Sequence, residues 1–264
     1  TSLDTLEIQF LEQALEDYID DETPELGPED FAHVLAEFWR YGETRPPKAG
    51  PMIRVRPALC VAGRPLTYDL IEIIQDDAPF LVDSVMGELG EQGVSVRAMF
   101  HPMLSVDRSS KGKRGGQGKR RESTILVVAD PLGDERRESI VTGLQASLAD
   151  VRMAVGDWEP MTAMMDRAIA GLERGAVGIE AGLMAENIAF LRWLQAGHFV
   201  FLGARDYDYP KGGAASETGA PLLQAGKGLG VLSDPDRSIL RRASEPAVLT
   251  KQMRRQIDLG EPVT

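Results

Sequence analysis

Residues 69–107 constrain the fold most, because they contain a strand, a helix and a second strand in immediate succession. Residues 70–74 are apolar and rich in β-branched side chains, which is typical of a buried strand. Gly93 is expected to end the helix, because a residue without a Cβ adopts the left-handed conformation at low cost. Residues 94–106 then alternate apolar and polar side chains. The helix between the strands is indicated by apolar residues near helical spacing after an acidic turn closed by Pro79: Phe80, Leu81, Val85 and Leu89.

The following residues extend this unit to a β-α-β-β-α order. Residues 123–130 read as a buried strand, and residues 135–155 as a helix with Ile140, Leu144 and Leu148 on one side. Over residues 66–150 this order is ferredoxin-like and lacks only a final strand, so the predicted fold class is α+β.

Residues 108–121 separate the last two strands and carry no apolar side chain. Because such a segment cannot offset its ordering entropy by burial, we expect a mobile hairpin loop. Binding of phosphate or RNA is the alternative, although the loop offers no aromatic residue for base stacking.

The flanking regions predict further helices and strands. Helices are expected over residues 3–20 and 28–41, and the aromatic side of the second helix either packs in the core or binds a partner. The remaining expectations are a linker at 42–51, a strand at 52–62 with Arg54 and Arg56 on one face, helices at 161–174 and 180–196, a linker at 175–182, and strands at 198–209 and 229–234.

Charge and composition limit the possible functions. The net charge of −12 and the isoelectric point near 4.8 argue against a nucleic-acid partner. The sequence lacks the run of about 18 apolar residues that a membrane span needs. The single cysteine, Cys60, favours a reducing, cytoplasmic location and is expected to be buried. The first residue is not Met and the last residues suggest no structural end, so we expect a piece of a longer protein.

Sequence motifs for catalysis are missing. His33, His101 and His198 are scattered, and neither a C-x-x-C nor an H-E-x-x-H motif occurs. Residues 226–233 lack the third glycine of a dinucleotide-binding loop. We therefore predict no catalytic residue, no metal site and no cofactor in this chain.

The acidic turn before the central helix is the best candidate for a site. Asp76 or Asp77 can cap the helix, can hold the ammonium group of an amino acid whose carboxylate meets the helix N–H groups, or can form an acid–base pair. For the second possibility, Gly93 and Val94 of an adjacent copy supply further contacts. The predicted effector-binding residues are Asp76, Asp77, Ala78, Phe80, Leu81, Val82, Gly93 and Val94.

The strand–Asp-Asp–helix order resembles an ACT domain, the amino-acid-sensing module of metabolic enzymes. Several segments together, spanning roughly residues 70–232, resemble the amino-terminal region of the large bacterial NAD-specific glutamate dehydrogenases. The basic loop at 108–121 and the residues after Lys251 depart from the family pattern. The segments are DDAPFLVDSVMGELGEQGVSVRAMFHPML, ILVV, DVRMAVGDWEPM, FLRWLQAGHFVFLGARDYDY and GLGVL.

The resemblance implies a non-catalytic regulatory or assembly region of an oxidoreductase that deaminates L-glutamate to 2-oxoglutarate and ammonia with NAD. It places the catalytic and NAD-binding parts far downstream. The implied partners are the protein's own downstream domains, other copies in a homo-oligomer, and an amino-acid effector acting allosterically; a purely structural scaffold is the alternative. The implied division is a helical segment over 1–50, an ACT-like domain with its following helix over 51–175, and part of a second α+β regulatory domain over 176–264.

Overall fold

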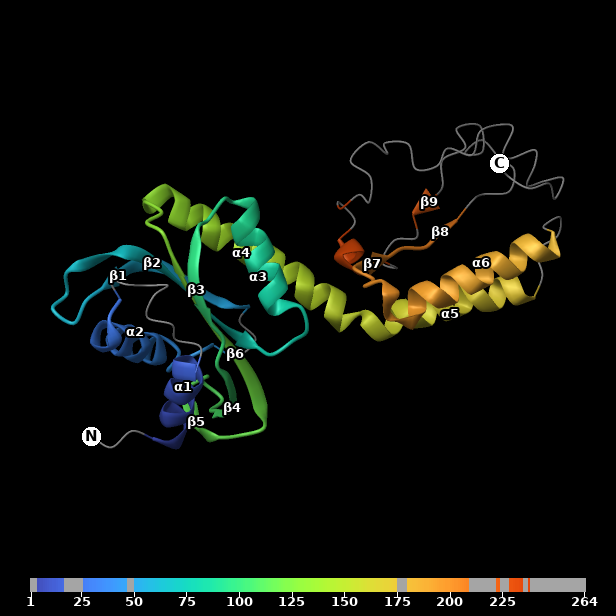
Figure 1. Cartoon of the computed structure of the whole chain (residues 1–264). Helices are drawn as coiled ribbons and strands as arrows, with labels where there is room; N and C mark the ends of the chain where they lie inside the picture. Colours follow the sequence, from blue (N-terminus) through green and yellow to red (C-terminus); the bar gives the residue numbers. More distant parts are fainter. Residues whose placement is uncertain are drawn as a thin grey trace. The chain divides into compact units, whose positions relative to one another are not determined.

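The computed structural model forms two compact units, residues 1–151 and 152–264, and each is described by itself (Figure 1). The three-part division expected from the sequence stays a prediction. The structure describes residues 4–16, 26–46, 50–174, 180–208, 222–223, 228–234 and 237.

The first unit is built on an antiparallel sheet whose order is β1-β2-β6-β4-β5, with β3 also paired to β6. The central strands β2 and β6 pair without a bulge from Asp69 opposite Ala129 to Asp76 opposite Glu122. The strands are β1 (Met52–Leu59), β2 (Pro65–Asp76), β3 (Val96–Phe100), β4 (Met103–Arg108), β5 (Arg114–Gln117) and β6 (Arg120–Ala129).

The ferredoxin-like α+β prediction is confirmed. β2, α3 (Leu81–Glu91), β3 with β4, β6 and α4 (Asp134–Gly156) follow the expected order. The edge position beside β2, where a ferredoxin-like fold places its last strand, is held by β1. Among the described strands of the first unit, β1 thus occupies the place of the final strand that the β-α-β-β-α order lacks.

The strand expected over residues 94–106 is divided at His101–Pro102. β3 pairs with the second half of β6 and β4 with its first half. Proline has no N–H for a strand ladder, so the break falls where this residue stands. The Pro102 carbonyl still accepts hydrogen bonds from the Thr124 N–H at 3.1 Å and the Thr124 hydroxyl at 2.6 Å.

Helices cover both faces of this sheet (Figure 1). α3 and α4 pack on one face, against Ile71, Ile73, Ile125 and Val127. α1 (Thr5–Glu16) and α2 (Pro28–Tyr41) pack on the other. The aromatic side of α2 is core: the rings of Phe31 and Phe100 lie 4.7 Å apart and those of Phe10 and Phe38 5.9 Å apart.

Two segments of the first unit are more regular than the sequence suggested. The hairpin expected at residues 108–121 is present, and it includes regular strands, because β5 pairs with β4 and β6 begins at Arg120. The expected linker at 42–51 is partly built into the fold: Thr44 forms a β-bridge with Lys113, and the Arg45 N–H donates to the Gly112 carbonyl at 3.0 Å. Backbone pairing and ion pairs order these segments without apolar side chains.

The second unit contains the helices α5 (Trp158–Glu173) and α6 (Ala181–Trp193), followed by the π-helical turn η2 (Leu194–His198). The strand expected over 198–209 forms only as β7 (Gly203–Ala204) and β8 (Tyr207–Asp208), which pair with β10 (Leu229–Gly230) and β9 (Leu222–Leu223). The strand expected over 229–234 stops at Gly230, where the 3-10 turn η4 (Val231–Ser233) follows. Most of the residues after Ser233 lie outside the described part. Among the described helices, none has the length and apolar composition needed to cross a bilayer.

Candidate functional site

The turn between β2 and α3 leaves the N-terminus of α3 open. Phe80 precedes the helix with φ 67° and ψ 10°, the one described non-glycine residue with positive φ, and its side chain is 46% exposed. No side-chain hydrogen bond caps this end in the described residues, so the prediction that Asp76 or Asp77 caps α3 was wrong. The first-turn N–H groups of a helix have no partner within the helix and favour an anion.

Asp76 and Asp77 do not act as a carboxylate pair, because neighbouring residues of a strand point to opposite faces. Asp76 follows Leu70 and Ile74 on the side of α1 and α2, where it pairs with Arg45 at 2.9 Å and Arg120 at 2.6 Å. Burial alone raises the pKa of Asp76, but the hydrogen bonds and charges of Arg120 and Arg45 outweigh it and lower the pKa to about 2. Asp76 is therefore a charged structural group at neutral pH.

Asp77 continues the ladder on the side of α3. Its N–H donates to the Arg121 carbonyl at 3.0 Å, and its carboxylate pairs with the Arg121 side chain at 3.1 Å. The Arg121 side chain is mostly exposed. An exposed ion pair of this kind contributes little to stability, so either group can exchange its partner for a ligand at small cost.

Three more polar residues lie at the same end of this face, and none of them was among the effector-binding residues predicted from the sequence. Gln75 is opposite Ser123 in the β2–β6 register, and both extend the alternation of Ile73 and Ile125, which face α3 and α4. His101 Nε2 lies 2.7 Å from the Ser123 hydroxyl. We name Gln75, Asp77, His101, Arg121 and Ser123 the α3-side polar cluster.

Gln75 is only 2% exposed, and its Nε2 atom has no hydrogen-bond partner. Buried side-chain polar atoms are nearly always paired, with protein, water or a ligand. The alternation of side chains along β2 places residue 75 on the same face as Ile71 and Ile73, which is apolar. A polar residue at this position could therefore have been recognised from the sequence as a candidate site residue.

The other predicted effector residues contribute in different ways. The Leu81 side chain is buried in the core and leaves only its backbone for a ligand, whereas Ala78 and Val82 are half-buried against that core. Gly93, with φ 63°, and the buried Val94 follow the opposite end of α3. An 11-residue helix is about 16 Å long, so one copy does not bring them to the β2–α3 turn. Their contribution from an adjacent copy stays a prediction.

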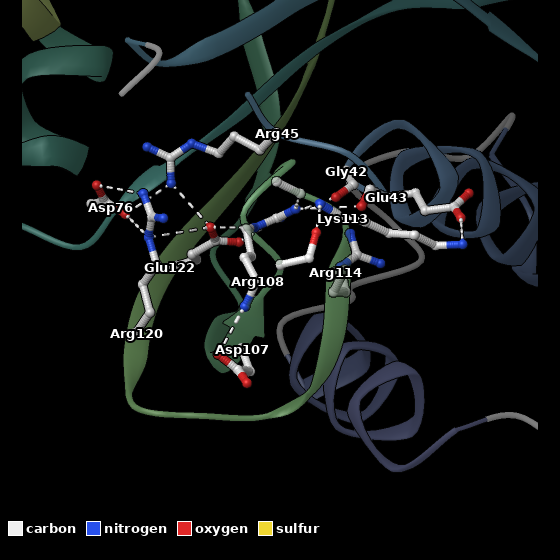
Figure 2. A network of polar contacts seen from close by, with 12 residues as sticks. Gly42, Glu43, Arg45, Asp76, Asp107, Arg108, Lys113, Arg114, Arg120 and Glu122 are labelled. Atoms are coloured by element: carbon white, nitrogen blue, oxygen red, sulfur yellow. Dashed lines mark hydrogen bonds and ion pairs between the residues drawn. The ribbon is translucent and has the colours of Figure 1, made fainter. Parts of the chain in front are cut away.

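On the opposite side of the strand ends, Arg45, Asp76, Arg108, Arg120 and Glu122 form an arginine–carboxylate network (Figure 2). Glu122 is 1% exposed and receives two hydrogen bonds of 2.7 Å from Arg108 and one of 3.0 Å from Arg45, which is 3% exposed. Arg108 also donates to the Gly42 carbonyl at 3.0 Å and the Gly112 carbonyl at 2.8 Å. The network fixes the segment after α2 and the β4–β5 turn to the sheet.

Arg114 connects β5 to α2. Its guanidinium lies 3.5 Å from the centre of the Trp39 ring and donates to the Trp39 carbonyl at 3.0 Å. Burial, together with the neighbouring charge of Arg108, lowers the pKa of Arg114 to about 10. Arginines that the sequence assigned to a mobile loop thus hold the first unit together.

The remaining candidate residues are dispersed. Cys60 is buried and unpaired, as expected. His198 Nδ1 lies 2.8 Å from the Trp193 carbonyl in the second unit, far along the chain from His101. In the described part of the chain, no three His, Cys, Asp or Glu side chains are grouped as a metal site requires. The chemistry available at the β2–α3 turn is therefore binding through an open helix N-terminus, one carboxylate, one guanidinium and a buried amide.

The comparisons with known proteins agree on one family. A family model described as "Glutamate dehydrogenase, ACT1 domain" matches residues 10–144. The NAD-specific glutamate dehydrogenase of Pseudomonas aeruginosa is 31% identical over 188 residues, which cover 67% of this chain and 12% of that protein. The NAD-specific glutamate dehydrogenase of Halomonas elongata is 31% identical over 191 residues, which cover 68% of this chain and 12% of that protein. The chain thus spans about an eighth of the length of these relatives.

Proposed function

Because the chain belongs to the family of glutamate dehydrogenase ACT1 domains, we propose that it is a non-catalytic regulatory region that binds an amino-acid effector at the β2–α3 turn. The parent protein then oxidises L-glutamate to 2-oxoglutarate and ammonia with NAD, in the cytoplasm, through domains outside this chain. Both relatives are named NAD-specific glutamate dehydrogenase, which supports this reaction for the parent protein.

The observation that carries the binding proposal is the open N-terminus of α3 beside the Asp77–Arg121 pair. The N–H groups of the first turn and Arg121 receive the effector's α-carboxylate, and Asp77 receives its α-ammonium group. Asp76 takes no direct part, because Arg45 and Arg120 already hold it on the other side of the sheet.

Calorimetric titration of this chain with the L-amino acids tests the proposal. We expect at least one of them to bind, and Asp77→Asn to weaken binding about tenfold or more, because a charge-assisted hydrogen bond to the ammonium group is lost. Asp130→Asn is the matched control: it also removes one carboxylate from an exposed arginine pair, Asp130–Arg97, at the other end of β6. Absence of heat with every amino acid, or equal loss in both variants, contradicts the proposal.

A structural role is the second candidate, favoured by the outer edge of β3. Among the described strands, β3 pairs only with β6, so its other side offers unpaired backbone groups to a second copy. On this reading the chain contributes to a homo-oligomer without a ligand. Light scattering distinguishes the two: a chain that stays monomeric at high concentration rules out assembly through this edge.

A further inference from the structure

The unpartnered amide of Gln75 indicates what kind of side chain the effector carries. Gln75 Nε2 is buried without a hydrogen bond, although its neighbour in the register, Ser123, is engaged with His101. An unpaired donor in the interior costs free energy that a bound oxygen atom recovers. A second, independent feature, the open N-terminus of α3, lies at the same end of the sheet.

The spacing of Gln75 and Asp77 suits one small ligand. The two residues are separated by two positions on an extended backbone whose ladder continues to Asp77, so their side chains leave the same face about 7 Å apart. An amino acid whose ammonium group meets Asp77 extends its side chain along the strand toward Gln75. The Nε2 atom there is a donor and calls for an oxygen acceptor.

The charges near the β2–α3 turn further limit which side chains the effector can carry. Arg121 stands beside Asp77, and Asp76 is held on the other face by two arginines. Apart from Asp77, the α3-side polar cluster contains no carboxylate to receive a second ammonium or a guanidinium group. A cationic side chain therefore finds no partner in the cluster, whereas a carboxylate or a carboxamide does.

We infer that the effector is an amino acid whose side chain ends in a carboxylate or carboxamide, and that Gln75 Nε2 hydrogen-bonds its oxygen. This inference rests on the proposed amino-acid binding at the β2–α3 turn. It makes Gln75 the residue that determines specificity, while Asp77 and the helix N-terminus recognise the groups common to all amino acids.

The test compares ligands and variants of this chain by calorimetry. The binding of L-Asp, L-Asn, L-Glu and L-Gln is compared with that of L-Leu, L-Met and L-Lys. Comparing each acid with its amide shows whether the site prefers a carboxylate or a carboxamide. We expect the best member of the first group to bind about tenfold or more tightly than any of the second. Gln75→Met, which keeps the length of the side chain, should abolish this preference.

Gln92→Met is the matched control, because it makes the same change at the far end of α3, where Gln92 Nε2 donates to Glu88 at 2.6 Å. Urea unfolding of the ligand-free chain supplies a second readout: Gln75→Met should leave stability unchanged or raise it, since no hydrogen bond is lost. A clear loss of stability shows that the amide already has a partner and overturns the inference. Binding without the side-chain preference overturns it while the proposed function stands, whereas no binding at all removes both.

Discussion

Replacing Glu122 by Gln is the sharpest test of how this domain is held together. The substitution keeps the shape of the side chain and removes its charge. Glu122 is 1% exposed and faces Arg108, with 2% of its side chain exposed, and Arg45, with 3%. The substitution removes the carboxylate that both buried arginines share. Among the described residues, Arg45 then keeps only its ion pair with Asp76.

Breaking a buried ion pair by removing one partner costs about 3–5 kcal/mol. A domain of this size has a total stability of about 5–15 kcal/mol, so the loss takes a large part of it. Because 1 kcal/mol shifts Tm by about 2–4 °C in a domain of about 150 residues, we expect Tm to fall by about 6–20 °C. Thermal unfolding followed by circular dichroism, together with a urea titration of the same samples, measures both quantities.

Asp130→Asn serves as the control here too, since it breaks a solvent-exposed pair with Arg97 and should leave the unfolding midpoint nearly unchanged. Unfolding of Glu122→Gln at the same midpoint as this control would refute a stabilising role for the network. That result would mean that water or rearranged neighbours compensate the two arginines, and that the network does not determine stability.

Two further predictions concern the same region. The pKa of Asp76 is lowered from 3.8 to about 2 in the folded chain, so its ion pairs stabilise the fold fully above about pH 4 and this contribution is lost as pH falls through about 2. In urea titrations at stepped pH, the stability difference between wild type and Asp76→Asn should therefore shrink below about pH 4 and vanish only below about pH 2. Gly112→Ala should destabilise the chain by more than about 1 kcal/mol, because φ is +83° and a Cβ would lie 1.8 Å from the Arg45 carbonyl oxygen, whereas Gly116→Ala meets no atom within 4 Å and should be near neutral in the same unfolding assay.

Local patterns predicted most of the elements of the first unit. The apolar alternation of β2 and β6, the helical spacing of α3 and the stop at Gly93 each act within a few residues, so the sequence shows them directly. The role of β1 was not predictable in this way. Its position beside β2 depends on pairing between Ile53 and Ile73, a contact that no local periodicity records.

The candidate site was predicted in part for the same reason. Asp77 and the N-terminus of α3 belong to one short segment, and the turn was found from the sequence. The arginine–carboxylate network was missed, because Arg45 and Glu122 are 77 positions apart and a charged, glycine-rich segment is more often solvated. The one signal in the sequence was a glutamate, Glu122, directly before the apolar strand expected at 123–130, and it identified neither of its arginine partners.

The register of β2 against β6 determines which polar residues face α1 and α2 and which face α3. Side chains alternate with a period of two, so one edge of the sheet carries two independent sets: Asp76, Arg120 and Glu122 toward α1 and α2, and the α3-side polar cluster toward α3. A slip by one residue would exchange the sets and place Ile71 and Ile73 where Leu70 and Ile74 now pack. Apolar burial along the strands and ion pairs at their ends therefore favour the same register. If the effector binds at Asp77 as proposed, it can replace Arg121 as the partner of Asp77, while the Arg120–Asp76 pair, one position away, keeps the strands aligned.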